Sequence, residues 1–459
     1  MFESFISAVF WGVLVLSVLV FVHEGGHFVA ARFFGMRVTE FFLGLPFRWH
    51  LSRKSKRFGT EFGVTPLLLG GYNRICGMEG TLDDQCASVL AAVQREGRVE
   101  VARVATELGL DEGRAYEIMA TLVDLGAIRP YYDSALDEKP WQREWPAAFE
   151  TLERDADLLT EYDADHDFST AGSTAAGAPH PVDDAEAFLA HETARTYVGK
   201  GAFARIVTLL AGPLVNILLA FVLVVGSLTL VGVEMYSNTS EIDSVVSGSY
   251  AESAGLKGGD RIIRFDNKDV STWDELVAAI DGALEHRGSI SIAYERAGET
   301  FETKVDLPED GTIDLFGVNA AKSIYHLGFS EAVAYTFGYI RLVAGTIVRL
   351  IMPTHTIEVV SQSSSIVGIS TMASEAAASG PNDLVLFAAA ISLSLGFMNL
   401  LPLPPLDGGK ILVELIQLAL RRPLSPKVQA ALSYVGLAFV LFIFCFALRN
   451  DIVRILGGM

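Results

Sequence analysis

The amino-acid sequence predicts an α-helical polytopic membrane protein with four transmembrane helices and soluble segments between them. Its 459 residues are 51% hydrophobic yet carry a formal net charge of −20, which indicates that apolar and acidic segments are separated along the chain. Four runs without a charged residue reach the length of about 18 residues that a helix needs to cross a bilayer. These runs are Phe5–Val22, Ile206–Val233, Leu384–Leu406 and Val428–Leu448.

The composition also excludes several classes of protein. Only 20% of the residues are charged, which excludes a mainly disordered chain. The negative net charge argues against nucleic acid as the main partner, because phosphate binding needs clustered Lys and Arg. The three cysteines, Cys76, Cys86 and Cys445, are too few and too scattered for a disulfide framework or a four-cysteine zinc site.

The first predicted transmembrane helix occupies residues 1–35. A cleaved signal peptide is the alternative, but this segment begins with Glu3 and has no Lys or Arg ahead of its apolar run, which favours a retained span. Basic residues gather after this run, so by the positive-inside rule this end is cytoplasmic and the N-terminus lies outside. They are Arg32, Arg37, Arg48, Arg53, Lys54, Lys56 and Arg57.

The remaining predicted transmembrane helices are 203–233, 384–418 and 428–448. Three basic residues, Arg421, Arg422 and Lys427, lie between the last two, which makes that loop cytoplasmic and agrees with four spans in all.

A fifth apolar stretch, 325–352, is interrupted by Arg341 and Arg349. Because of these two charges it is predicted as an interfacial amphipathic helix rather than a span.

Three soluble segments separate these helices. Residues 36–78 contain short strand-like runs beside the membrane, and residues 238–310 form a domain outside. Residues 79–200 form a cytoplasmic insert with 26 acidic and 10 basic residues, so it carries 16 of the 20 excess negative charges. Within the insert, the composition of 155–181 predicts a linker.

A candidate metal site closes the first span. On a helix, His23 and His27 lie on one face, so both imidazoles can bind one Zn2+. Glu24 then lies where it can take a proton from a water molecule activated by the metal. Ionisable residues in an apolar span are costly and indicate function. The structural alternative is two interfacial histidines with a glutamate that reaches toward water.

The third span supplies a third candidate ligand, Asp407. It ends an uncharged run in which Pro402, Pro404 and Pro405 break the helix, and at membrane depth a break is tolerated only where the backbone is buried or lines a cavity. Both spans run from outside to inside, so Asp407 and the histidines reach a similar depth. The alternative for Asp407 is a helix or turn cap, since Asp-Gly-Gly favours turns.

With these residues the sequence resembles the site-2 protease family of intramembrane zinc metalloproteases, most closely its bacterial branch with an outward PDZ domain. The matching motifs cover the chain from end to end outside the insert. They are His23-Glu24-x-x-His27, Pro66–Tyr72, Ala211-Gly212-Pro213-x-x-Asn216, Asn399–Gly409 and Asn450-Asp451-Ile452.

The resemblance implies a role for each motif. His23, His27 and Asp407 would bind zinc, and Glu24 would act as general base and acid in peptide hydrolysis. Asn216 and Asn399 would contact the substrate backbone or a developing oxyanion. For Asn216 the structural alternative, with Gly212, is helix packing by a small and a polar residue.

Residues 36–72 resemble the membrane-associated β-segment of the family. That segment presents an edge strand to the substrate, which places Gly70 and Gly71 among the substrate-binding residues. Edge-strand pairing would hold the peptide extended.

Two soluble domains complete the predicted fold. Ser253–Ile263 resembles the core of PDZ domains, which bind chain ends by strand addition; a structural module without a ligand is the alternative. Cys86–Tyr132 contains two helical patterns, Val99–Leu108 and Glu112–Leu125, and is similar to a winged helix. The predicted fold is therefore four transmembrane helices, a membrane-associated β-segment, one extracytoplasmic PDZ domain and an inserted cytoplasmic winged-helix-like domain.

A winged helix commonly binds DNA, but the charges favour another role here. The second helical pattern has four acidic residues against one basic residue, Arg114, so we favour a protein-interaction or regulatory role for the insert. The acidic residues are Asp111, Glu112, Glu117 and Asp124.

Together these features predict a multi-pass protein of the cell membrane, with its active site toward the cytoplasm and its PDZ domain outside. The resemblance implies hydrolysis of transmembrane protein substrates within lipid, such as membrane-tethered anti-sigma factors, with remnant signal peptides as a second class. A catalytically silent adaptor around a structural zinc is one alternative, against which the retained Glu24 argues. A transporter is another, against which the lack of an inverted repeat argues.

Overall fold

The computed structural model describes residues 2–78, 82–140, 142, 145–286, 288–307, 316–422 and 424–457. The start of the predicted insert at 79 and the end of the predicted outer domain at 310 lie outside these ranges. The chain divides into two compact units, Met1–Val224 with Thr336–Met459, and Val225–Tyr335.

The first unit is built on apolar helices. They are α1 (Phe2–Phe33), α6 (Ala202–Gly226, extended by a π-helical turn at Ser227–Val231), α9 (Phe329–Leu350), α10 (Thr356–Ser361), α11 (Ile366–Ser379), α12 (Pro381–Asn399), α13 (Asp407–Leu420) and α14 (Pro426–Gly457). Among the described residues, five of these helices are long and apolar enough to cross a membrane: α1, α6, α9, α12 and α14. The chain is therefore a multi-pass membrane protein, and the number of four spans stays a prediction.

Two predicted segments differ in detail from the helices observed. The segment 384–418 comprises two helices, because the chain is not helical from Leu400 to Leu406, where the three prolines lie. The segment 325–352 contains α9, whose last residue, Leu350, is buried against Val360 and Leu401. This end of α9 thus packs beside the break between α12 and α13, and the interfacial position of the helix stays a prediction.

The closing Asn-Asp pair of the sequence fastens α14 to the neighbouring helices. The carboxylate of Asp451 is buried and accepts hydrogen bonds from the backbone N–H groups of Ser365 (2.6 Å) and Gly368 (3.1 Å) at the start of α11. The amide of Asn450 donates to the carbonyl of Val360 at the end of α10. This motif therefore satisfies backbone groups that a helix end leaves without partners.

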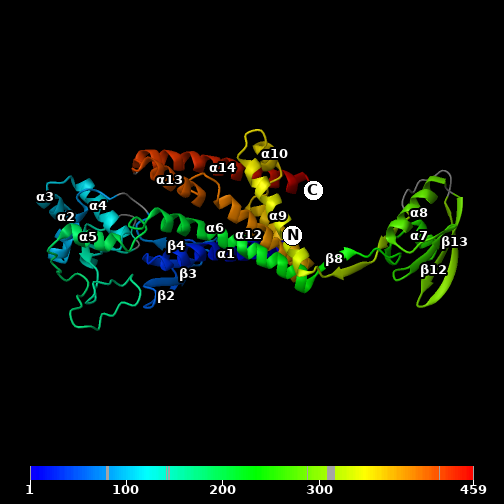
Figure 1. The fold of residues 1–459 in the computed structure, drawn as a ribbon, viewed down its shortest axis with the longest axis horizontal. Helices are drawn as coiled ribbons and strands as arrows, with labels where there is room; N and C mark the ends of the chain where they lie inside the picture. The colour runs from blue at the N-terminus through cyan, green and yellow to red at the C-terminus, as the bar shows by residue number, and fades with distance from the viewer. Residues whose placement is uncertain are drawn as a thin grey trace. The chain divides into compact units, whose positions relative to one another are not determined.

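A four-stranded sheet follows α1, as expected for residues 36–78. Its strands are β1 (Val38–Leu43), β2 (Leu51–Ser55), β3 (Thr60–Val64) and β4 (Gly71–Ile75). The order is β2-β3-β1-β4, with β1 parallel to β3 and antiparallel to β4, so β4 is an edge strand. Figure 1 shows this sheet between α1 and the helices of the insert.

The insert has its own hydrophobic core. Its elements are α2 (Cys86–Glu96), β5 (Arg98–Glu100), α3 (Val101–Leu108), α4 (Glu112–Asp124), β6 (Ile128–Tyr131), a 3-10 turn (Ser134–Leu136), β7 (Ala148–Thr151) and α5 (Ala185–Thr193). The three strands form a sheet in the order β5-β7-β6. Helices α3 and α4 match the two predicted patterns, whereas α2 was not predicted. Side chains such as Leu90, Ile118, Leu122 and Phe149 are fully buried between these elements.

The second unit folds around a separate core. Its elements are β8 (Val233–Tyr236), β9 (Ile242–Val245), α7 (Tyr250–Ser253), β10 (Arg261–Phe265), β11 (Lys268–Asp269), α8 (Trp273–His286), β12 (Gly288–Arg296), β13 (Glu299–Leu307), β14 (Val318–Ala320) and β15 (Lys322–Tyr325). The main sheet has the order β11-β10-β12-β13, and β14 pairs with β9 and β15 with β8. Ile262, Phe265, Leu276 and Ile292 are buried beneath it.

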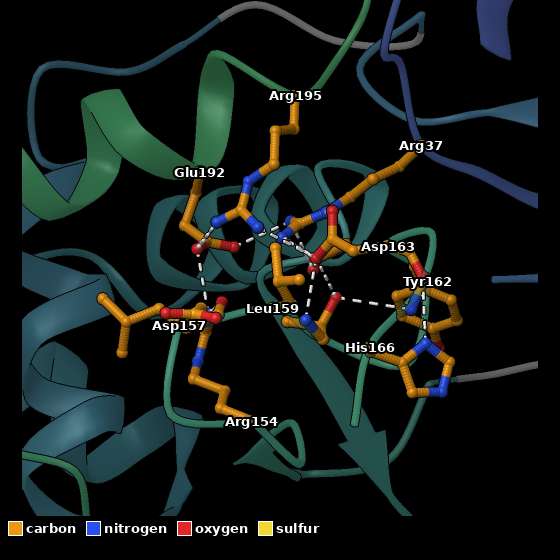
Figure 2. A network of polar contacts seen from close by, with 12 residues as sticks. Arg37, Arg154, Asp157, Leu159, Tyr162, Asp163, His166, Glu192 and Arg195 are labelled. Atoms are coloured by element: carbon orange, nitrogen blue, oxygen red, sulfur yellow. Dashed lines mark hydrogen bonds and ion pairs between the residues drawn. The ribbon is translucent and has the colours of Figure 1, made fainter. Parts of the chain in front are cut away.

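A buried ionic network joins the insert to the sheet (Figure 2). Arg37, between α1 and β1, lies with its side chain 1% exposed against two carboxylates of the insert. Its guanidinium forms a two-point contact with Asp163 (2.8 and 2.7 Å) and an ion pair with Glu192 (2.7 Å), and it also donates to the carbonyl of Gly126 (3.0 Å).

Two further arginines complete this network. Arg154 pairs with Glu192 at 2.9 Å and Arg195 with Asp163 at 3.1 Å. Asp163 lies within residues 155–181, the segment whose composition predicted a linker, and Arg154 directly precedes that segment. That segment has no helix or named strand among its described residues, but its buried polar side chains pack into the network rather than into solvent.

We expect Arg37→Met to lower the stability of the insert by about 3–5 kcal/mol, because it leaves two buried carboxylates without their main partner. Thermal unfolding and limited proteolysis of the detergent-solubilised protein would measure the loss. Arg103→Met is the matched control, since Arg103 forms an exposed ion pair with Glu96 and its loss should cost less than about 1 kcal/mol. Equal effects of the two variants would contradict the importance of the network.

The same network should make the insert sensitive to acid. Burial raises the pKa of both carboxyls, but pairing with Arg37 outweighs it: the pKa of Asp163 lies below its ordinary 3.8 and that of Glu192 well below its ordinary 4.5. The stabilisation is therefore complete above these ordinary values and is lost as pH falls through the lower folded values. Protection of the amides of the insert, that is the ratio of the intrinsic to the observed exchange rate at each pH, should fall between about pH 5 and about pH 3, and less steeply in Arg37→Met. Unchanged protection over this range would contradict the assignment.

Candidate metal centre

The two histidines of α1 face the same point. Their Nε2 atoms lie 3.2 Å apart, and both side chains are buried. The Nδ1 atom of His27 lies 2.7 Å from the carbonyl oxygen of Thr208 in α6. That carbonyl can accept a hydrogen bond only from Nδ1–H, so Nε2 of His27 carries a lone pair for a ligand.

Close packing of α1 on α6 fixes this orientation. A Cβ atom on Gly26 would lie 2.5 Å from the carbonyl oxygen of Ala211, and one on Gly212 would lie 2.3 Å from Nε2 of His27. Glycine at both positions thus allows the two helices to touch beside the imidazoles. The Ala211–Asn216 motif has a packing role here as well as any chemical one.

Asp407 follows the non-helical segment between α12 and α13, and its side chain lies beside the two histidines. One carboxylate oxygen, Oδ2, lies 3.1 Å from Nε2 of His23 and 3.3 Å from Nε2 of His27. Asp407 is the first residue of α13, where Leu406 takes the cap position and no side-chain cap is formed. The alternative that Asp407 serves as a helix cap is therefore wrong.

Two glycines allow the backbone to double back at this point. A Cβ atom on Gly408 would lie 2.3 Å from the carbonyl oxygen of Leu400, and one on Gly409 would lie 2.0 Å from the backbone nitrogen of Pro404. The broken segment therefore folds over the start of α13 and holds Asp407 at the histidines.

The donor set fits a zinc ion. Ligand atoms about 2.0–2.1 Å from a tetrahedral Zn2+ are about 3.3–3.4 Å apart, close to the three distances among His23, His27 and Asp407. The Nε2 atom of His27 carries a lone pair, Oδ2 of Asp407 belongs to a carboxylate, and Nε2 of His23 carries a lone pair in one of its two neutral tautomers, so one cation can be bound by all three atoms. Three protein ligands leave one position open, as in catalytic zinc sites.

Glu24 is half-buried on α1, and its carboxylate is held by a residue that the sequence analysis did not identify. The side-chain amide of Asn73 donates to Oε2 of Glu24 at 2.8 Å and to its main-chain oxygen at 2.9 Å. The only signal in the sequence is an amide at the third position of the short strand that begins at Gly71.

The four candidate substrate-binding residues occupy two regions. Asn216 lies one turn after Gly212 on α6 and is fully buried, and neither atom of its amide has a hydrogen-bond partner within the described part of the chain. Asn399 is half-buried at the last residue of α12. The amide of Asn216 is thus a buried polar group without a partner among the described residues.

Gly70 and Gly71 begin the edge strand β4. Gly70 has a φ of +134°, which favours glycine. A Cβ atom on Gly71 would lie 2.9 Å from the carbonyl oxygen of Phe42 and 3.6 Å from Cα of Phe21. The tight contact of Gly71 is thus with the neighbouring strand β1, whereas its contact with α1 is an ordinary van der Waals one.

A second buried ion cluster holds α13, and it too was missed from the sequence. Glu414, two turns after Asp407, forms an ion pair with Arg205 of α6 at 2.9 Å and accepts a hydrogen bond from the Tyr197 hydroxyl at 3.2 Å. Tyr197 follows α5 of the insert. The insert therefore contacts both helices that carry candidate metal ligands, through Arg37 next to α1 and through Glu414 in α13.

Comparison with known proteins agrees with this geometry. The model of Peptidase family M50 matches residues 11–443. Zinc metalloprotease RasP of Shouchella clausii is 26% identical over 96% of this chain and 98% of its own length. Regulator of sigma-W protease RasP of Bacillus subtilis is 25% identical over 98% and 99%, and Probable protease eep of Enterococcus faecalis 24% identical over 96% and 98%.

The family match extends across the membrane helices and both candidate metal-binding segments, so the resemblance to site-2 proteases is confirmed. The relative in Shouchella clausii is named a zinc metalloprotease, in agreement with the donor set of the site. The chain therefore belongs to Peptidase family M50 and is a multi-pass membrane zinc metalloendopeptidase of the site-2 protease type.

Proposed function

We propose that this enzyme cuts peptide bonds in or beside the transmembrane helices of membrane-tethered regulatory proteins. The observation that carries the proposal is the meeting of His23, His27 and Asp407 at 3.1–3.3 Å, with Glu24 beside them, on helices long and apolar enough to cross a membrane. A relative in Bacillus subtilis is named a regulator of sigma-W protease, which supports anti-sigma-factor-like substrates. Remnant signal peptides form a second proposed class.

Each residue of the site has a proposed task. His23, His27 and Asp407 hold the metal. Zinc, when bound, supplies a Lewis acid that polarises a carbonyl group and makes water a better acid. Glu24 takes a proton from the attacking water and delivers it to the nitrogen of the leaving amine.

Two further groups would hold the substrate in an extended form. The free edge of β4 offers backbone hydrogen bonds to a peptide strand. The amide of Asn216, buried without a partner among the described residues, can pair with the peptide backbone in a site that excludes water. Gly70, Gly71 and Asn399 are the other proposed substrate-binding residues.

We propose that the site faces the cytoplasm, with the N-terminus outside, because basic residues gather after α1 and between α13 and α14. The unit Val225–Tyr335 would then lie outside as a PDZ domain; its sheet β11-β10-β12-β13 and helix α8 are compatible with that assignment. The acidic insert would be a winged-helix-like module that binds a protein rather than nucleic acid.

We expect Glu24→Gln to reduce cleavage of a purified transmembrane reporter substrate by at least about 100-fold, since general acid–base catalysis is lost. Bound zinc, measured by mass spectrometry of the purified protein, should remain. Glu3→Gln, at the far end of the same helix, is the matched control and should keep full activity. A Glu24→Gln enzyme that still cleaves the substrate would refute the proposal.

We expect Asp407→Ala to lose most of the bound zinc, because only two ligands remain. The measurement is the zinc content after dialysis, independent of activity. Glu414→Gln is a useful comparison, because it alters the same helix two turns away without removing a ligand. Full zinc content in Asp407→Ala would exclude Asp407 as a ligand.

Asn216→Leu should have opposite effects on stability and activity. It replaces a buried amide that lacks a partner by an apolar group of similar volume, so thermal stability should rise by about 1–3 kcal/mol. Cleavage should fall by about 100-fold or more if this amide pairs with the substrate. Loss of both stability and activity would instead indicate a purely structural amide.

A further inference from the structure

Asn73 makes two contacts with one residue, the proposed general base. Its Nδ2 atom lies 2.8 Å from Oε2 of Glu24 and 2.9 Å from the main-chain oxygen of Glu24. A primary amide has two N–H donors, so both can be used here at once. Because the amide of Asn73 bridges the carboxylate of Glu24 and the main-chain oxygen of Glu24, the Glu24 side chain loses most of its rotamer freedom.

The strand geometry explains why Asn73 points at α1. Successive side chains of a strand face opposite sides, so Asn73 shares a face with Gly71, and Tyr72 and Arg74 share the other. Gly71 lies against the backbone of Phe21 in α1, which places Asn73 against the next turn of that helix. On the opposite face, the Tyr72 hydroxyl donates to Glu40 at 2.9 Å.

The contact with Asn73 uses one acceptor position of the base. Oε2 accepts this hydrogen bond, which leaves one lone pair of Oε2 and both lone pairs of Oε1 for other contacts. A neutral amide donor holds the carboxylate without neutralising it, whereas Lys or Arg at this position would compete for the charge.

We infer that Asn73 is a positioning residue that orients the carboxylate of Glu24 and ties it to the edge strand of the sheet. The inference rests on the proposed role of Glu24. It also links substrate binding to chemistry, because the strand with which a peptide would pair, β4, is the strand that contains Asn73. Strand pairing and orientation of the base are thereby coupled through one residue.

The test compares substitutions of Asn73 in the full-length enzyme, with kcat, KM and bound zinc measured separately on the transmembrane reporter substrate. Asn73→Leu keeps the volume and removes the donor. Asn73→Asp keeps the shape and places a second carboxylate against Glu24. Both should lower kcat about 10- to 100-fold with little change in KM and zinc content, because the reacting groups are misplaced. Asn73→Gln, which keeps the amide, should recover part of the loss.

Thr39→Val is the matched control. The Thr39 hydroxyl donates to the carbonyl of Arg74 in β4 at 3.3 Å, so this variant weakens the hold on the same strand without touching Glu24. It should retain kcat. If Asn73→Leu and Thr39→Val behave alike, or if Asn73→Leu acts through KM or zinc loss, the inference is overturned.

The proposed function and the role of Asn73 can be disproved separately. An active Glu24→Gln enzyme removes the proposed function and the role of Asn73 with it. An inactive Glu24→Gln enzyme together with a fully active Asn73→Leu enzyme removes only the inference about Asn73.

Discussion

Burial of a charged or polar side chain in apolar surroundings is costly unless the side chain finds a partner, and this cost organises much of the membrane unit. His23 and His27 enter the packed interior from α1, and Asp407 enters from α13, so their meeting defines where these two helices lie. Glu414 fixes α13 a second time, against Arg205 of α6. At the far end of the helices, Asp451 accepts two backbone hydrogen bonds from the start of α11.

The insert obeys the same constraint outside the apolar helices. Arg37 leaves the end of α1 and is buried between Asp163 and Glu192, which belong to parts of the chain more than a hundred residues away. The acidic composition of the insert is thus not only a property of its surface. Part of its negative charge is used inside, to hold the module on the membrane enzyme.

The sequence could predict those features that depend on the pattern within a single segment of the chain. The spacing of His23 and His27 is a property of one helix, and the prolines before Asp407 interrupt one run, so both features are legible without a structure. The third candidate ligand, Asp407, could be paired with the histidines only from the expected depth of the two helices in the membrane. The pairs Glu24–Asn73 and Arg205–Glu414 leave no such trace, since each joins two segments whose individual patterns are unremarkable for a strand or a helix. The composition of residues 155–181 gave no sign that Asp155, Thr160 and Asp163 would be buried or that Asp163 would pair with Arg37, and their assignment as a linker stays a prediction.

The contact between α1 and α6 has a consequence for the direction from which a peptide can arrive. Gly26 lies against the backbone of Ala211 with no room for a methyl group, and Gly212 lies equally close to His27. On α1, Glu24 is turned roughly 160° around the helix axis from Gly26. Helix α6 therefore closes one flank of the candidate metal centre, and Glu24 faces away from it, toward Asn73 and the sheet. With Glu24 as the proposed base, we expect a scissile bond to be presented to it from the side of β4.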